Sequence, residues 1–492
     1  MEHFSFDNSY ARLPERFYSR LPPTPVESPS LIRVNVELAT LLGVDVDTLS
    51  CREGVEVLSG NRVPMGSEPL AMAYAGHQFG GWVPRLGDGR AILLGEIVAR
   101  DGIRRDIQLK GAGRTPFSRG GDGRAALGPI LREYILSEAM HALRVPTTRS
   151  LAAVTTGEQV RREELLPGAI LTRVARSHIR VGMFEYFASR GDFEAIRVLA
   201  DHVIDRHYSK VRSDDHPYLS LLEAVLETQA QLVARWMHIG FIHGVMNTDN
   251  TAVAGETIDY GPCAFMDTYQ AQTVFSSIDQ MGRYAFINQP GIAQWNLMQL
   301  ARCLLPILHE DENHALAEAQ SLIDGFPERI NAAILKGYCE KLGLSEYRKD
   351  DEELVQSLLN CMSENDADFT LTFRNLANLL DRNDDQEGQP RNLFKDPLAF
   401  DGWAARWLAR LSDQSVSCGD HATRLRHVNP AFIPRNHLVE EVIRAAEDDG
   451  DFAPFNRLVD ILAHPFDEQP SASRYALPPR PDQLVHQTFC GT

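Results

Sequence analysis

A carboxylate and an amide close together in the sequence indicate metal-dependent phosphate chemistry. The stretch HGVMNTDN (243–250) ends in Asp249 and Asn250, and Asp259 begins the triplet DYG shortly afterwards. Oxygen ligands of this kind suit Mg²⁺, which also binds nucleotide phosphates. A single Asp-x-Gly predicts only a turn, but Asn250 and Asp259 together, after a predicted helix, are a more specific signal for a metal site. We therefore predict that Asn250 and Asp259 bind Mg²⁺ or Mn²⁺.

The same stretch departs from a known pattern at one position. Kinase-like enzymes carry H-x-D-x-x-x-x-N and then D-F-G, and the Asp of the first motif is the catalytic base. His243 and Asn250 have this spacing, but Val245 stands where the base is expected. A hydrocarbon accepts no proton, whereas a carboxylate within hydrogen-bond reach of a hydroxyl does. Asp249 is therefore the predicted proton acceptor.

Two glycine-rich stretches lie upstream, RLGDGRA (85–91) and KGAGRTPFSRGGDGRAALG (110–128). Taken alone, Asp-Gly predicts a hairpin turn, and the longer stretch is compatible with a linker that carries solvated charges. The functional interpretation is that backbone N–H groups and arginines hold a polyphosphate. Because the chain has a net charge of −18, we favour an anionic ligand at these arginines.

Lys110 ends a predicted strand, and a helical glutamate is its expected partner. In kinases such a lysine pairs with a helix Glu and holds phosphate oxygens. Glu133 and Glu138 are both candidates, and Glu133 is preferred because it lies nearer the strand end in a compact lobe.

Hydrophobic periodicity predicts the elements that position these residues. The first part reads as strands around one helix, a small sheet with a single packed helix: 90–98, 105–110, 128–143 (the helix), 149–156 and 168–175. Later segments read as helices: 218–240, 294–307, 311–324, 327–341 and 350–362. Residues 1–70 and the tail from 466 are expected to be extended, and 381–390 to form a solvated loop.

Composition limits the class of protein. The 492 residues are 43% hydrophobic and 24% charged, which is typical of a soluble globular chain with two or more lobes. The acidic net charge disfavours nucleic acid and anionic membranes as partners. No membrane-spanning run or signal peptide is expected. Seven scattered cysteines without C-x-x-C indicate a reducing compartment, so a cytoplasmic location is expected. We also expect the protein to be a monomer.

Longer segments resemble the selenoprotein O family of kinase-like protein adenylyltransferases. They are YAGHQFGGWVPRLGDGRA, QLKGAGRTPFSRGGDGRA, LTRVARSHIRVGMFEYFA, HGVMNTDN, DYGPCAF and NPAFIPRN, and the resemblance spans almost the whole chain. It implies an α+β, protein-kinase-like bilobal fold with N-terminal and C-terminal extensions. The implied boundaries are 1–70 (N-terminal extension), 71–176 (N-lobe), 177–400 (helical C-lobe) and 401–492 (C-terminal extension and tail).

The resemblance also implies an activity. ATP binds in a flipped orientation in that family, so AMP rather than phosphate passes to Ser, Thr or Tyr hydroxyls of proteins, with redox-related proteins as one candidate class. The implied nucleotide-binding residues are Gly87, Gly89, Arg90, Lys110, Asp122, Gly123, Arg173, Arg180 and Asp259. Asp249 is implied as the base, Asn250 and Asp259 as metal ligands, and Glu133 as the partner of Lys110. The choice between ATP and UTP stays open.

Two other functions remain as alternatives. A protein or small-molecule kinase is disfavoured by Val245, and a non-catalytic nucleotide-binding pseudokinase is disfavoured by Lys110, Asn250 and Asp259. The resemblance further suggests a regulatory disulfide between Cys263 and Cys490, near the end where some family members carry selenocysteine. For each cysteine taken alone, a free thiol is expected.

Overall fold

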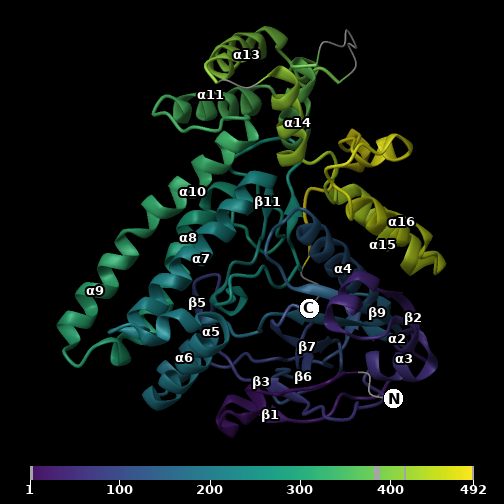
Figure 1. Cartoon of the computed structure of the whole chain (residues 1–492). Coiled ribbons are helices and arrows are strands. Elements are labelled where there is room, and N and C mark those ends of the chain that lie inside the picture. The colour runs from purple at the N-terminus through teal and green to yellow at the C-terminus, as the bar shows by residue number, and fades with distance from the viewer. Residues whose placement is uncertain (1–3, 382–387, 415–416, 490–492) are drawn as a thin grey trace.

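The computed structural model describes residues 4–381, 388–414 and 417–489, and combines a sheet-rich part with a larger helical part (Figure 1). Within the described residues, eight strands form one antiparallel sheet in the order β1-β3-β6-β7-β10-β9-β2, with β8 paired to β10. The strands are β1 (Tyr18–Arg20), β2 (Ser30–Val34), β3 (Leu70–Met72), β6 (Ala91–Val98), β7 (Arg104–Lys110), β8 (Ala125–Ala126), β9 (Arg149–Arg161) and β10 (Leu165–Ala175). The mixed α+β class and the four longest predicted strands are confirmed.

Strand register gathers polar groups on one face of this sheet. Lys110 pairs with Ala91 of β6 and Leu171 of β10, and Arg173 of β10 lies opposite Gln108 of β7. Residues directly opposite in an antiparallel pair, and residues two apart on one strand, share a face. Gln108, Lys110 and Arg173 therefore face the same side.

Helices cover both faces of the sheet, so the expectation of a single packed helix is wrong. The predicted helix is present as α4 (Leu127–Ala142) and packs on β9 and β10. Three short helices cover the other face: α1 (Val36–Leu42), α2 (Val46–Ser50) and α3 (Arg52–Leu58). Residues 1–70 are thus not simply extended, because Leu38 and Leu42 of α1 and Leu58 of α3 are apolar side chains that bury against the sheet.

The long helix α7 (Pro217–Ile239) leads directly to the site. Gly240, with φ +70, ends it in the left-handed conformation that favours glycine. The chain then forms β11 (Phe241–Ile242), which pairs with β12 (Ala264–Phe265). Residues 243–263, which carry the predicted base and metal ligands, connect these two strands.

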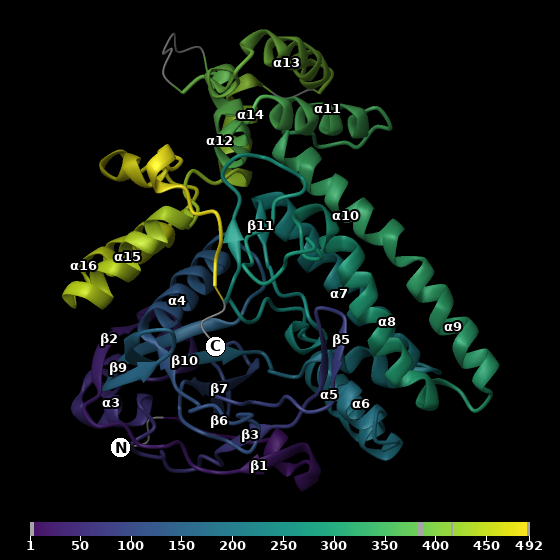
Figure 2. The same ribbon diagram turned by 180° about the vertical axis from the view of Figure 1, so that it is seen from behind.

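The predicted helices after residue 290 are confirmed with small shifts of their ends. The helices not yet given are α5 (Val181–Ala188), α6 (Phe193–His207), α8 (Gln289–Leu308), α9 (Glu312–Asp324), α10 (Phe326–Lys341), α11 (Asp351–Glu364), α12 (Phe369–Asn375), α13 (Pro397–Ser412), α14 (Cys418–Val428), α15 (Asn436–Asp449) and α16 (Ala453–Leu462). Helices α6, α8, α9 and α10 pack around α7, and the other helices lie farther out in the helical part or on α4 (Figures 1 and 2).

The C-terminal segment returns to the centre of the molecule. Helices α15 and α16 pack on α4, and neither was predicted from the sequence. The tail then runs back toward the site (Figure 2), where the Thr488 N–H donates to the Phe275 carbonyl at 2.8 Å. Residues 382–387 of the predicted loop lie outside the described residues. No helix in the described part is long and apolar enough to cross a membrane.

Candidate active site

A cavity of about 810 Å³ collects most of the predicted site residues. An adjoining cavity of about 80 Å³ shares Arg90, Arg180 and Asp259 with it. The larger cavity is lined by Gly87, Gly89, Arg90, Asp122, Gly123, Arg180, Asp249, Asn250 and Asp259, and the smaller one adds Lys110 and Arg173. Segments far apart in the sequence thus meet around one space.

A buried charge cluster lies at the inner end of β7. The Lys110 ammonium is paired with Glu133 of α4 and lies 3.6 Å from the Asp259 carboxylate. Arg173 donates to the other oxygen of Glu133 from Nε at 2.7 Å. Burial alone would raise the pKa of Glu133, but Arg173 and Lys110 outweigh it and hold that pKa below its ordinary value. Glu138 pairs with Arg149 at 2.7 Å instead.

Asp259 is kept ionised in a strained backbone conformation. Burial would raise the pKa of its carboxyl, but Lys110, Arg173, Arg90 and Arg180 hold the pKa well below its usual range. Its φ is +66, in the left-handed region that residues with a Cβ rarely adopt. Such strain is typical of functional positions, where the surrounding structure holds it.

The pKa of the Asp249 carboxyl is shifted in the opposite direction to that of Asp259. Burial raises the pKa of its carboxyl from 3.8 to about 6, despite a hydrogen bond from Gln78 and the nearby Arg180. Its Oδ1 is buried and has no hydrogen-bond partner among the described residues. A carboxylate with a pKa near neutrality and one vacant oxygen has the properties of a general base.

A short hairpin fixes the loop that carries Asp249. Strands β4 (Gly76–Gln78) and β5 (Gly81–Val83) form it, and the Gln78 amide donates to Asp249 Oδ2 at 3.2 Å. The backbone N–H of Phe79 donates to Asn247 Oδ1 at 2.9 Å. A Cβ on Gly76 would lie 2.7 Å from Asp249 Oδ1, so only glycine allows this approach.

Asn250 is oriented for a cation. Its side-chain nitrogen donates to the Val245 carbonyl at 3.1 Å, which leaves the amide oxygen as the atom to bind a ligand. The described residues contain no cluster of three or more His, Cys, Asp or Glu side chains that would hold a metal by themselves. Two protein oxygens completed by phosphates and water suit Mg²⁺, so the donor set fits.

The two glycine-rich stretches form one wall of the large cavity. Thr115 donates to the Asp88 carbonyl at 2.7 Å, and Ser118 donates to the Gly89 carbonyl, so the second stretch packs on the first turn. Gly87 has φ +82, and a Cβ there would overlap the Phe117 ring. The Asp122 carboxylate is paired with Arg162 at 2.9 Å.

Sequence reasoning missed several lining residues. Tyr74, Gln78 and Asn247 lie in motifs that resemble the family, but none has a spacing signal of its own. Arg161 and Arg162, which also line the cavity, sit at the end of β9 in an ordinary charged turn. Only the fold brings these residues to the site.

Comparison with known proteins assigns the family. The family model described as "Protein adenylyltransferase SelO" matches residues 1–463. The chain belongs to this family. Proteins named "Protein nucleotidyltransferase YdiU" are similar over full length: 60% identical in Rhodopseudomonas palustris (strain BisB5), covering 100% of this chain and 99% of the relative. The corresponding protein of Bradyrhizobium diazoefficiens is 59% identical with the same coverage. That of Methylorubrum extorquens is 60% identical with 99% coverage of both chains.

In this SelO family member the structure describes only one of the two cysteines of the predicted disulfide. Cys263 is buried directly after the Asp259 loop, and burial raises the pKa of its thiol to about 12. Cys490 lies outside the described residues, so the pairing stays a prediction.

Proposed function

We propose that this chain transfers AMP from ATP to the hydroxyl of Ser, Thr or Tyr side chains in other proteins. Its family is one of protein adenylyltransferases, and its relatives are named as nucleotidyltransferases. The observation that carries the proposal is the contrast between the two carboxylates of the cavity. Asp259 is held ionised by cations, while Asp249 has a raised pKa and one unpartnered oxygen.

In the proposed reaction the acceptor hydroxyl attacks the α-phosphorus. A bond forms between the acceptor oxygen and the α-phosphorus, the bond from that phosphorus to the bridging oxygen breaks, and pyrophosphate leaves. Asp249 accepts the hydroxyl proton through Oδ1. Val245 offers no proton acceptor at the position of a kinase base, which favours this route over phosphate transfer.

Cations stabilise the charge that develops on the leaving group. Lys110, Arg173, Arg90 and Arg180 line the inner part of the site, and such preorganised groups act most strongly where water is excluded. Asn250 and Asp259 would hold Mg²⁺ or Mn²⁺, which supplies further neutralisation of phosphate charge when bound. Arg161 and Arg162 line the same cavity and are suited to the distal phosphates of a flipped ATP.

The arrangement of elements supports a kinase-like, bilobal interpretation. The sheet with Lys110 and α4 with Glu133 correspond to an N-lobe (71–176), and α7 with the loop after β11 corresponds to a C-lobe (177–400). The segments 1–70 and 401–492 are then extensions, since α1 to α3 cover the sheet and α15 and α16 cover α4.

The phosphate of ATP that becomes bound to the acceptor protein distinguishes the possible functions, and an isotopic label identifies it. The protein is incubated with Mg²⁺, an acceptor protein and ATP labelled on either the α- or the γ-phosphate. Protein-bound α-label with release of pyrophosphate is expected, and α-labelled UTP in parallel reports nucleotide choice. Protein-bound γ-label would assign a kinase instead, and no label of either kind with retained ATP binding would assign a nucleotide-binding scaffold.

A further inference from the structure

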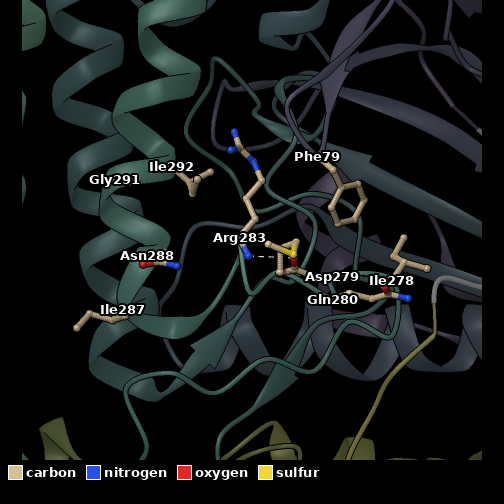
Figure 3. A pocket seen from close by; sticks show the side chains of 10 residues that line it. Phe79, Ile278, Asp279, Gln280, Arg283, Ile287, Asn288, Gly291 and Ile292 are labelled. Carbon is tan, nitrogen blue, oxygen red and sulfur yellow. Dashed lines mark hydrogen bonds between the residues drawn. The ribbon is translucent and has the colours of Figure 1, made fainter.

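A second cavity, of about 780 Å³, opens beside the 810 Å³ cavity that contains Asp249 and Asp259. It is formed by the segment 278–283, the start of α8 and Phe79 from the hairpin turn (Figure 3). Phe79 and Ile278 line both cavities, so the two spaces adjoin. Among the described residues, those that line the second cavity include no lysine and no glycine-rich loop. This distinguishes the second cavity from the proposed phosphate-binding part of the site.

Apolar side chains are exposed along this second cavity. Ile278, Met281 and Ile287 are 57%, 92% and 50% exposed. Single exposed apolar residues are ordinary, but a group of them around a concave surface is typical of an interaction site. The surface therefore offers burial to an apolar side chain of a partner.

One cation in the cavity has no carboxylate partner. Among the described residues Arg283 forms no ion pair, and its Nε is buried without a hydrogen-bond partner. Its guanidinium lies 4.9 Å from the Trp295 ring and 5.7 Å from the Tyr284 ring, which hold it in place. Figure 3 shows the Arg283 side chain between α8, with Ile292, and Phe79.

The acid in the same cavity is already satisfied. Asp279 accepts the backbone N–H groups of Arg283 at 2.9 Å and Tyr284 at 2.7 Å, which shapes the turn that presents Arg283. Asp279 is thus held by the backbone and forms no ion pair with Arg283, so an arriving acidic group would find the Arg283 guanidinium without a carboxylate partner among the described residues.

Asn247 links this surface to the proposed base. Its Oδ1 accepts from the Phe79 N–H at 2.9 Å and from the Tyr284 hydroxyl at 2.6 Å. Both walls of the second cavity are thus tied to the loop that carries Asp249. A chain bound there would be positioned relative to the base, as orientation of an acceptor requires.

From this geometry we propose that the 278–292 cavity binds the acceptor polypeptide, and that Arg283 selects an acidic residue near the modified hydroxyl. The occupant is a protein segment with one acidic and one apolar side chain close to its Ser, Thr or Tyr. The inference rests on the proposed AMP transfer for the identity of the acceptor.

Peptides with a central Ser, Thr or Tyr and Glu, Gln or Lys at each flanking position test the inference. Transfer is measured as kcat/KM, and binding without ATP is measured by fluorescence polarisation. The wild type is expected to favour Glu-flanked peptides. Arg283→Glu is expected to lower kcat/KM for them at least about tenfold, through KM, and to shift the preference to Lys. ATP affinity is expected to stay unchanged.

Two further variants keep the test decisive. Met281→Glu changes a side chain that is 92% exposed, and it should weaken binding of a Glu-flanked peptide that also carries a Leu beside the acceptor residue. Arg302→Glu makes the same charge change as Arg283→Glu at an exposed site farther along α8 and should behave as wild type. Equal effects of Arg283→Glu and Arg302→Glu, or no flank preference in the wild type, would overturn the proposal.

The outcome separates this inference from the proposed function. If no peptide receives AMP but Glu-flanked peptides still bind through Arg283, the acceptor surface stands and the transfer reaction fails. If AMP is transferred without dependence on Arg283 or Met281, the reaction stands and the acceptor surface fails. A dimer that Met281→Glu dissociates, with unchanged peptide preference, would assign the cavity to a second copy and overturn the proposal.

Discussion

The Gln78 amide donates a hydrogen bond to Asp249 Oδ2 at 3.2 Å, while Oδ1 of the same carboxylate is buried without a partner among the described residues. One oxygen is thus held by the hairpin, and the other is available for the proton transfer that we propose. The hairpin that carries Gln78 therefore lies at the proposed reaction centre, although no sequence motif assigned it a role.

Replacing Gln78 by Leu tests this relationship. The hydrogen bond from Gln78 lowers the pKa of Asp249, so its loss should raise that pKa further. We expect kcat to fall about 10- to 100-fold, as for a lost bond to a charged group. The pH profile of kcat/KM should also shift to higher pH. Gln78→Glu is expected to be worse because it places a second carboxylate beside the first. A reduced rate with an unshifted profile would indicate a structural role only.

Removal of the proposed base should separate chemistry from binding. Asp249→Asn is expected to lower AMP transfer by about 10²- to 10⁴-fold, the range for a lost general base, with ATP affinity retained. Asp259→Asn should instead lose Mg²⁺-dependent ATP affinity, because it removes a proposed metal ligand and the negative charge beside Lys110. Both are read by calorimetric titration and α-label transfer, with the exposed Asp214→Asn as control. Near-normal transfer by Asp249→Asn would contradict the assignment.

The raised pKa of Asp249 predicts how stability depends on pH. Its carboxyl has a pKa of about 6 in the folded protein, against 3.8 ordinarily, so the folded state favours the protonated form. Ionisation therefore lowers the free energy of unfolding as pH rises through about 6, and this cost is absent below about pH 4. Without nucleotide, Asp249→Asn should be more stable than wild type by about 1–3 kcal/mol at pH 8, and equally stable near pH 4. Denaturant unfolding at both pH values measures this, and a destabilised variant at pH 8 would contradict it.

Glu133 holds two buried cations, so Glu133→Gln should harm both fold and site. Lys110 and Arg173 would lose the carboxylate that they share, and loss of one partner of a buried pair costs about 3–5 kcal/mol. ATP affinity should fall as well. Glu138→Gln on the same helix is the matched control, since Glu138 pairs with Arg149 and Asn35 instead. It should lose stability but keep ATP affinity. Equal ATP binding by both variants would show that the cluster does not organise the nucleotide site.

The tail contact supports a test of the proposed redox switch. Thr488 donates to the Pro262 carbonyl, and Ser277 donates to the Thr488 carbonyl at 3.1 Å, so the described end of the tail lies beside the segment with Cys263. A disulfide requires Cα atoms within about 7 Å. We expect reductant to raise the activity of oxidised protein, and Cys490→Ala to remove that response. The exposed Cys418→Ala should keep it. A peptide map of oxidised protein without a 263–490 crosslink would exclude the switch.

The sequence by itself determined the local elements and predicted the chemistry of the motifs. The strands that end at Lys110 and contain Arg173, the helix with Glu133, and the end of α7 at Gly240 follow from periodicity and from glycine, which are properties of short segments. The types and spacing of Asp249, Asn250 and Asp259 indicated metal and proton chemistry before any fold was known.

Only the tertiary structure decided what surrounds those groups. Sequence left Glu133 and Glu138 as alternatives, and the register of β7 and β10 against α4 pairs Lys110 with Glu133. The raised pKa of Asp249 and the lowered pKa of Asp259 depend on burial and on cations from distant segments. The approach of Gln78 to Asp249 and the covering of the sheet by α1 to α3 join distant segments in the same way. Such contacts depend on packing between segments far apart in the chain, and no local pattern encodes them.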